Sequence, residues 1–290
     1  MKNKITYLSK SKVVIDDDKK YIYKVRRDDK EELYKYLKSK NFLNFLPYTE
    51  KNNHYEIYRY IEDSKLPKED KAIELIYILS LLHTKTTIYQ DINIDKIKEL
   101  YEQTKEHINY LKTYYLDLQD YIETKIFMSP AEYLLMQNIS KFYRALNYSD
   151  YKIDEWYALK EKEKTERIVQ LHNNATLDHF LKEENSYLIN WDYAKKDYVI
   201  YDFLKFYKNE YLDLEMTSLF DLYQTKYEYT KDELLLFESF ISIMPKITFS
   251  KTNYINTLEV RTIINYVDKT NEFLSKYYEK NQKSNEEEFK

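Results

Sequence analysis

The sequence predicts an α+β fold with a small β-rich N-terminal part and a larger helical C-terminal part. Strand-like runs of β-branched and aromatic residues occur within residues 1–60, and helical periodicity dominates from Leu66 on. Short strand-like segments return between residues 167 and 200. The chain has no internal repeat and no Pro- or Ser-rich linker. We therefore expect the two parts to be joined closely, near residues 61–67.

The N-terminal elements are predicted in the order strand, strand, helix, strand. Residues 12–15 and 21–25 flank a polar turn and read as a hairpin. Residues 28–40 place apolar side chains on one helical face, and residues 55–61 alternate as a strand does. This order is typical of a small sheet that carries one helix.

Helices are predicted along most of the chain after residue 66. They cover residues 67–83, residues 92–125, two segments that begin at the capping boxes Ser129–Glu132 and Thr230–Glu233, and residues 257–278. The charged residues 279–290 are predicted to form a disordered tail.

Two residue types are absent, Gly and Cys. Average usage would give about 20 Gly in a chain of this length. Without Gly, positions of positive φ must be filled by Asn, Asp or another tolerant residue, and a Walker A loop or dinucleotide fingerprint is excluded. Without Cys, the chain can form no disulfide, no thiolate metal site and no cysteine nucleophile.

Charge and hydropathy exclude further classes. The 46 basic and 50 acidic residues give a formal charge of −4, which shows no bias toward nucleic acid. The N-terminus lacks the apolar run of a signal peptide, and no stretch approaches the apolar length of a transmembrane helix. We expect a cytoplasmic protein with no membrane insertion and no nucleic-acid partner.

Two segments in the second half have the spacing of a catalytic loop and a metal loop. Residues 172–181 read His-Asn-Asn-Ala-Thr-Leu-Asp-His-Phe-Leu, and residues 188–194 read Leu-Ile-Asn-Trp-Asp-Tyr-Ala. In phosphotransferases of the aminoglycoside and choline kinase type, the corresponding segments read roughly His-Gly-Asp-x-x-x-x-Asn-x-Leu and Ile-Asp-Trp-Asp/Glu. The chain resembles this protein-kinase-like superfamily. The resemblance implies a two-lobed kinase-like fold, with an N-lobe at residues 1–66, a helical C-lobe at residues 67–278 and the tail at residues 279–290.

The three reactive positions of the pattern are all substituted. The resemblance places Asn174 at the aspartate base, His179 at the metal-binding Asn and Asn190 at the metal-binding Asp. An amide accepts no proton at neutral pH, and general-base assistance is worth about 10²–10⁴-fold. An amide oxygen and an imidazole are also poor ligands for Mg²⁺. The pattern predicts a degenerate active site with no catalytic residue, and we expect neither ATP nor Mg²⁺ as a cofactor.

A vestigial nucleotide site is predicted in the N-terminal part. Lys24 lies on a strand that resembles the one whose Lys holds nucleotide phosphates, and Glu31 or Glu32 would be its ion-pair partner. A solvated charge at a strand edge is an equal alternative for Lys24. Both glutamates also fit an ordinary helix surface.

Three residues near the loops receive other roles. His172 and Asp202 are predicted to be structural, with Asp202 accepting backbone N–H groups to fix the loop. Asp192 is the carboxylate near the presumed metal site that could still bind a metal.

The finer resemblance is to spore-coat kinase-like proteins of low-GC Gram-positive bacteria. It rests on residues 177–181, 189–194 and 200–206. It predicts a pseudokinase that acts as a binding or structural module with protein partners, in the cytoplasm or the spore coat. The alternative is a divergent ATP-dependent kinase of small molecules that uses Asp178 or Asp192. A plain helical scaffold is a third hypothesis and would require a helical N-terminal third.

Overall fold

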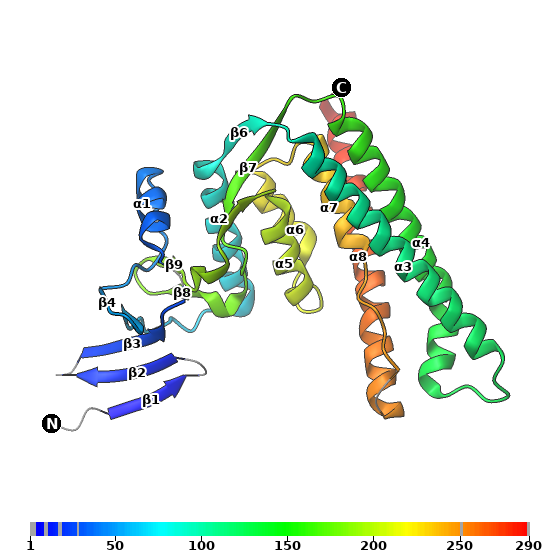
Figure 1. Cartoon of the computed structure of the whole chain (residues 1–290), viewed down its shortest axis with the longest axis horizontal. Helices are drawn as coiled ribbons and strands as arrows, with labels where there is room; N and C mark the ends of the chain where they lie inside the picture. The colour runs from blue at the N-terminus through cyan, green and yellow to red at the C-terminus, as the bar shows by residue number, and fades with distance from the viewer. Residues whose placement is uncertain (1–3, 9–10, 17–18, 28, 250–251, 289–290) are drawn as a thin grey trace. The chain divides into compact units, whose positions relative to one another are not determined.

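The computed structural model describes residues 4–8, 11–16, 19–27, 29–249 and 252–288, and they form two compact units (Figure 1). The first unit comprises Met1–Ile88, Ile168–Phe206 and Asp221–Glu228, and the second comprises Tyr89–Arg167, Tyr207–Phe220 and Tyr229–Lys290. Both catalytic-type loops therefore belong to the same unit as the N-terminal strands. These units divide the chain at other places than residues 66 and 67, where the lobe boundary stays a prediction.

An antiparallel sheet forms the N-terminal part of the first unit. Its strands are β1 (Lys4–Leu8), β2 (Ser11–Asp16), β3 (Lys19–Val25), β4 (Glu50–Lys51) and β5 (Tyr55–Arg59), in the order β1-β2-β3-β5-β4. The predicted hairpin and third strand are confirmed, and the hypothesis of a helical N-terminal third is wrong. The register sets Lys24 of β3 directly opposite Glu56 of β5. The hairpin's turn residues 17 and 18 lie outside the described residues.

The remaining elements of the first unit carry the two loops. They are α1 (Glu31–Ser39), α2 (Lys68–Thr86), the short helices η1 (Leu177–His179) and η2 (Trp191–Tyr193), β8 (Phe180–Lys182), β9 (Ser186–Leu188) and β10 (Lys195–Asp197). Chain segments shared by both units form β6 (Ile88–Asp91), β7 (Thr165–Leu171) and α5 (Ile200–Glu210). β8 and β9 form a hairpin between the loops, and β10 pairs with β7 just before the first loop. The edges of Phe42 and Phe45 pack against Trp191, which fixes η2 in the core.

Asparagine fills the left-handed backbone positions. Among the described residues, positive φ occurs at Asn41, Asn173 and Asn190, with values of 55°, 56° and 66°. This confirms that a chain without Gly uses Asn where a turn needs this conformation. Two of the three positions lie in the catalytic-type loops.

The second unit is helical. It contains α3 (Ile94–Glu123), α4 (Pro130–Lys160), α7 (Lys231–Ser242), α8 (Asn253–Glu288) and most of the connection from α5 to α6 (Met216–Gln224). α3 and α4 form a long helical hairpin, drawn in green in Figure 1, and α4 also packs against α7 and α8. The capping boxes at the starts of α4 and α7 are confirmed. Among the described residues, no helix combines the length and the apolar character that crossing a membrane requires.

The last helix is longer than the sequence predicted. α8 continues to Glu288, past Tyr278, where we expected it to end before a disordered tail. Residues 279–288 lack an apolar face, but most of them are Glu, Lys, Gln or another residue that a helix tolerates. Residues 289 and 290 lie outside the described residues.

Candidate functional site

Asp202 holds the start of the catalytic-type loop through hydrogen bonds to its backbone. Its side chain, at the start of α5, is fully buried, and it accepts the backbone N–H groups of His172 at 2.8 Å and Asn173 at 2.6 Å. This is the geometry expected for Asp202. His83 at the end of α2 adds a third bond, with its Nε2 3.0 Å from Asp202 Oδ2 and its Nδ1 2.7 Å from the Tyr223 hydroxyl. The role of Tyr223 had no signal in the sequence.

His172 joins the two loops to each other. Its Nε2–H donates to the backbone carbonyl of Ile189 at 2.8 Å, and its ring packs edge-on against Trp191 at 4.7 Å between ring centres. Burial lowers the pKa of His172 to about 4, so the imidazole stays neutral. A neutral, fully buried ring that bonds backbone fits the structural role predicted for it.

The three substituted positions lie together and are bonded to one another. His179 Nδ1 is 2.9 Å from the backbone carbonyl of Asn174 and 3.0 Å from the Thr176 hydroxyl. His179 Nε2 is 3.0 Å from the amide nitrogen of Asn190. When Nδ1 carries the proton, His179 donates to Asn174 and accepts from Asn190. Asn174 therefore contributes its backbone to this chain of hydrogen bonds.

Lys24 extends this series of hydrogen bonds on the other side of Asn190. Its ammonium donates to Asn190 Oδ1 at 2.5 Å and forms an ion pair with Asp192 Oδ2 at 2.6 Å. Burial lowers the pKa of Lys24, and the bond to Asp192 offsets part of that effect. Both ends of the Asn190 amide are thus occupied by protein groups. The structure brings Lys24 to the metal loop, where it faces protein carboxylate and amide groups.

A second lysine completes the cluster. Lys30, the residue before α1, lies 2.9 Å from Asp192 Oδ1 and 3.0 and 2.9 Å from the two carboxylate oxygens of Glu56. The Tyr58 hydroxyl donates to Glu56 at 2.7 Å. The side chains of Lys30, Asp192 and Glu56 are 4%, 4% and 1% exposed. Burial opposes the charge on Lys30, but its two carboxylate partners outweigh it and raise the pKa of Lys30.

Asp192 is held ionised by the same contacts. Burial acts to raise the pKa of Asp192, but the ion pairs with Lys24 and Lys30 lower it below its usual value. Sequence reasoning missed both Lys30 and Glu56. A glutamate at an inward position of an alternating strand was the available signal, because such a residue needs a buried partner.

The predicted ion pair between Lys24 and Glu31 or Glu32 is wrong. Glu31 pairs with Lys51 at 2.8 Å and with Lys35, and Glu32 is 89% exposed beside Lys35. Both glutamates lie on the outward side of the first turn of α1. The partner of Lys24 comes instead from the metal loop, where Asp192 lies.

The donor set does not fit a divalent metal ion. Within the described part of the chain, no three His, Cys, Asp or Glu side chains are grouped as a metal site would group them. Asp192, the candidate ligand, has an ammonium group at each oxygen, and the Asn190 oxygen also faces an ammonium group. Mg²⁺ prefers carboxylate oxygens that are free of such competitors. The site as it stands offers it none.

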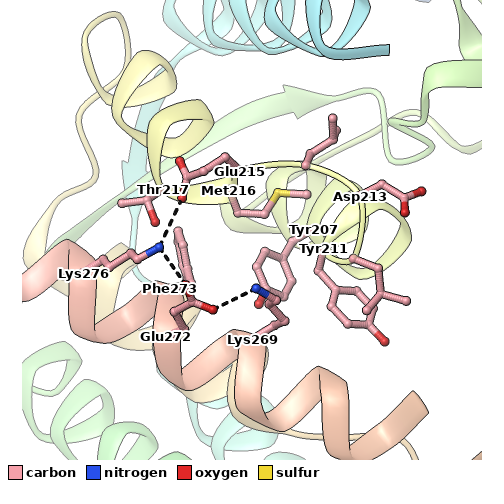
Figure 2. A pocket seen from close by; sticks show the side chains of 12 residues that line it. Tyr207, Tyr211, Asp213, Glu215, Met216, Thr217, Lys269, Glu272, Phe273 and Lys276 are labelled. Atoms are coloured by element: carbon pink, nitrogen blue, oxygen red, sulfur yellow. Dashed lines mark hydrogen bonds and ion pairs between the residues drawn. The ribbon is translucent and has the colours of Figure 1, made fainter. Parts of the chain in front are cut away.

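A pocket of about 230 Å³ lies in the second unit and was not foreseen (Figure 2). It is lined by the connection between α5 and α6 on one side and by α8 on the other. Figure 2 shows Met216, Tyr207 and Phe273 on its apolar side and Glu272 between Lys269 and Lys276. The Glu272 carboxylate lies 2.9 Å from Lys269 and 2.7 Å from Lys276. Asp213 and Glu215 also line the pocket, so its charged residues are three acidic and two basic side chains.

Comparison with known proteins supports the fold and goes no further. No protein-family model matches the sequence, and no curated protein matches it. The structure is similar to that of an aminoglycoside phosphotransferase from Alicyclobacillus acidocaldarius, with a TM-score of 0.71, 12% identity and coverage of 96% of this chain and 92% of that one. It is also similar to the AMP-bound spectinomycin phosphotransferase APH(9)-Ia, with a TM-score of 0.54, 13% identity and 92% coverage of both chains. The predicted α+β, two-lobed kinase-like fold is confirmed.

Proposed function

We propose that this protein is a pseudokinase, a kinase-shaped module that binds partners and does not transfer phosphoryl groups. The proposal is supported mainly by the continuous series of hydrogen bonds from the Asn174 carbonyl through His179 and Asn190 to Lys24. In the phosphotransferases that the chain resembles, these positions supply the base, the metal ligands and the phosphate contact. Here the side chains of His179, Asn190 and Lys24 bond to one another, and the base position contributes only its backbone carbonyl.

The chemistry of phosphoryl transfer explains why these substitutions matter. The reaction depends on positioned metal ions, phosphate contacts and a group that orients the acceptor hydroxyl. The amide of Asn174 cannot take the acceptor's proton, which removes a contribution of about 10²–10⁴-fold. The Asn190 oxygen accepts from the Lys24 ammonium, so a cation there would meet a positive charge at 2.5 Å from that oxygen. The groups in place therefore supply neither a general base nor a metal ligand that is free of a nearby ammonium group.

The proposed setting is spore-coat assembly, where the protein would bind protein partners after synthesis in the cytoplasm. The support is the similarity of residues 177–181, 189–194 and 200–206 to spore-coat kinase-like proteins. A fluorescent fusion in a sporulating low-GC Gram-positive host should collect at the coat. Asn190→Ala should leave that localisation unchanged, and a diffuse signal at all stages would contradict the setting.

Activity measurements test the proposal directly. Titration with ATP and Mg²⁺ should give no metal-dependent binding heat. Transfer from γ-labelled ATP to spectinomycin, other aminoglycosides or choline should not exceed that of the Lys24→Ala/Asn190→Ala variant. Turnover that the wild type shows and the Asn190→Ala variant loses would overturn the proposal.

A divergent small-molecule phosphotransferase is the second candidate. One observation favours it, because Asp178 is exposed in the catalytic-type loop beside His179 and could approach an acceptor hydroxyl. In that case Asp178→Asn should abolish transfer, whereas Asp213→Asn, at the pocket of the second unit, should not. ATP and Mg²⁺ would then be required.

A further inference from the structure

We propose that Lys30 is an internal counterion that takes the place of a divalent cation at Asp192. It would block metal binding even if the substituted positions were restored. The inference rests on the proposed function in one respect, since both take the metal loop as the place where a metal–nucleotide complex would have to bind. Its evidence is separate, because Lys30 lies outside the catalytic-type loops.

Each carboxylate oxygen of Asp192 lies beside an ammonium group, and at Oδ1, which has no hydrogen-bond partner, this contact is an ion pair. Oδ2 lies 2.6 Å from Lys24 and Oδ1 lies 2.9 Å from Lys30. The carboxylate is 4% exposed, so both ion pairs are largely shielded from solvent. A metal ion could bind Asp192 only after an ammonium group had moved away.

Lys30 is the less movable of the two lysines. The Lys24 side chain is 22% exposed, so part of it is in contact with solvent. The Lys30 side chain is 4% exposed and is also held by both oxygens of Glu56, which is itself bonded by Tyr58. Displacing Lys24 would therefore still leave a fixed positive charge on Asp192.

The charge balance of the cluster makes the same point. Lys24, Lys30, Asp192 and Glu56 carry two positive and two negative charges, so the buried group is neutral and a divalent ion would leave it with a charge of +2. Asn190→Asp alone would still leave +1 with the ion bound. Combined with Lys30→Met, it would make the ion-bound cluster neutral. Uncompensated buried charge is unfavourable, so the double variant is expected to bind the ion more tightly than Asn190→Asp alone.

A Mn²⁺ titration tests this inference, with binding measured as the decrease in the EPR signal of free Mn²⁺. The set comprises the wild type, Asn190→Asp, Lys30→Met, the double variant, and Asn190→Asp/Lys35→Met as the control, since Lys35 is 62% exposed. The double variant should bind Mn²⁺ roughly tenfold or more tightly than Asn190→Asp alone, because it removes a nearby ammonium charge from a weakly screened site. The control should behave as Asn190→Asp does.

The outcomes separate this inference from the proposed function. If Asn190→Asp alone binds Mn²⁺ as tightly as the double variant, Lys30 is no barrier and the inference fails, while the assignment of Asn190 as the defect survives. If the folded double variant binds no better than the single variant, the inference also fails. Mg²⁺-dependent catalysis by the wild type would overturn both proposals, because it requires a metal ion at the loop that Lys30 is proposed to block, whereas the two metal-binding outcomes above overturn the inference alone.

A second variant guards against a loss of folding. Asn190→Asp/Lys30→Gln has the same charge as Asn190→Asp/Lys30→Met, and its Gln side chain offers an amide donor to Asp192 and Glu56 in place of the ammonium group. Circular dichroism should be recorded with and without Mn²⁺. If either double variant is unfolded without metal, Mn²⁺ should restore the native spectrum, and a spectrum that Mn²⁺ does not change would overturn the inference.

Discussion

Each unit contains a buried lysine held by two carboxylates, and the two clusters differ in the groups that those carboxylates contact next. In the second unit, Lys160 at the end of α4 is 1% exposed and lies 2.6 Å from Asp232 and 3.0 Å from Glu163. In the first unit, Lys30 lies 2.9 Å from both Asp192 and Glu56. By burial and ion pairing alone the two lysines would be judged alike.

The difference lies in the groups beyond the carboxylates. Asp232 is in the first turn of α7 and bonds the capping residue Thr230, so the Lys160 cluster fastens one helix end to another. Asp192 instead leads through Lys24 to Asn190 and the catalytic-type loop. A buried ion pair by itself therefore does not identify a functional site. The Lys30 cluster is distinguished by its connection, through Lys24, to Asn190 at a substituted position of the metal loop.

The largest effect is expected from removing either buried lysine. Lys160→Met and Lys30→Met should each lower the free energy of unfolding by about 3–5 kcal/mol, because each leaves buried carboxylates without their cation. Urea denaturation measures both. In single-tryptophan backgrounds and native buffer, Lys30→Met should shift the emission of Trp191, which adjoins Asp192, and Lys160→Met should not. A shift of Trp191 emission in both variants would remove the distinction between the clusters.

A pH effect of intermediate size is expected from the first unit. The folded pKa of His172, about 4, lies below the ordinary value near 6.5, so the unfolded chain binds a proton first as pH falls. Its contribution is complete above about pH 6.5 and is lost as pH falls toward 4. The stability should be about 2 kcal/mol lower at pH 5 than at pH 8 from this group.

Urea midpoints across this pH range measure the effect of His172. His172→Gln should reduce the slope of stability against pH. His54→Gln, at an exposed histidine, should leave that slope unchanged. An unchanged slope in His172→Gln would show that other groups cause the acid sensitivity.

The smallest effects compare two asparagines with positive φ. Asn41 follows α1, where its backbone N–H bonds the Lys38 carbonyl, whereas the Asn190 side chain bonds both His179 and Lys24. Asn41→Gly should change the free energy of unfolding by less than about 0.5 kcal/mol, and Asn41→Ala should lower it by about 1 kcal/mol. Asn190→Gly should cost about 1–2 kcal/mol, because Gly adopts the left-handed backbone but His179 and Lys24, which are partly buried, lose their bonds to the side chain. Thermal denaturation measures the set, and equal costs for the two glycine variants would contradict the side-chain role of Asn190.

The sequence by itself determined the local features of this protein. Alternating and helical periodicities predicted the N-terminal strands and the long helices, and Ser129 and Thr230 marked helix starts. The absence of Gly predicted Asn at positive φ, and the resemblance of the two loops to those of aminoglycoside and choline kinases implied the kinase-like fold. These features depend on residues close together in the chain, so a single sequence contains them.

Only the tertiary structure decided the partners of the buried charges. Lys24 pairs with Asp192, far away in sequence, and not with Glu31 or Glu32 on the nearby helix. Lys30 carries no pattern that distinguishes it from the surface lysines around it until folding buries it between Glu56 and Asp192. A charged side chain is stable in the interior only beside a compensating group, and which groups meet is fixed by packing between segments remote in the chain.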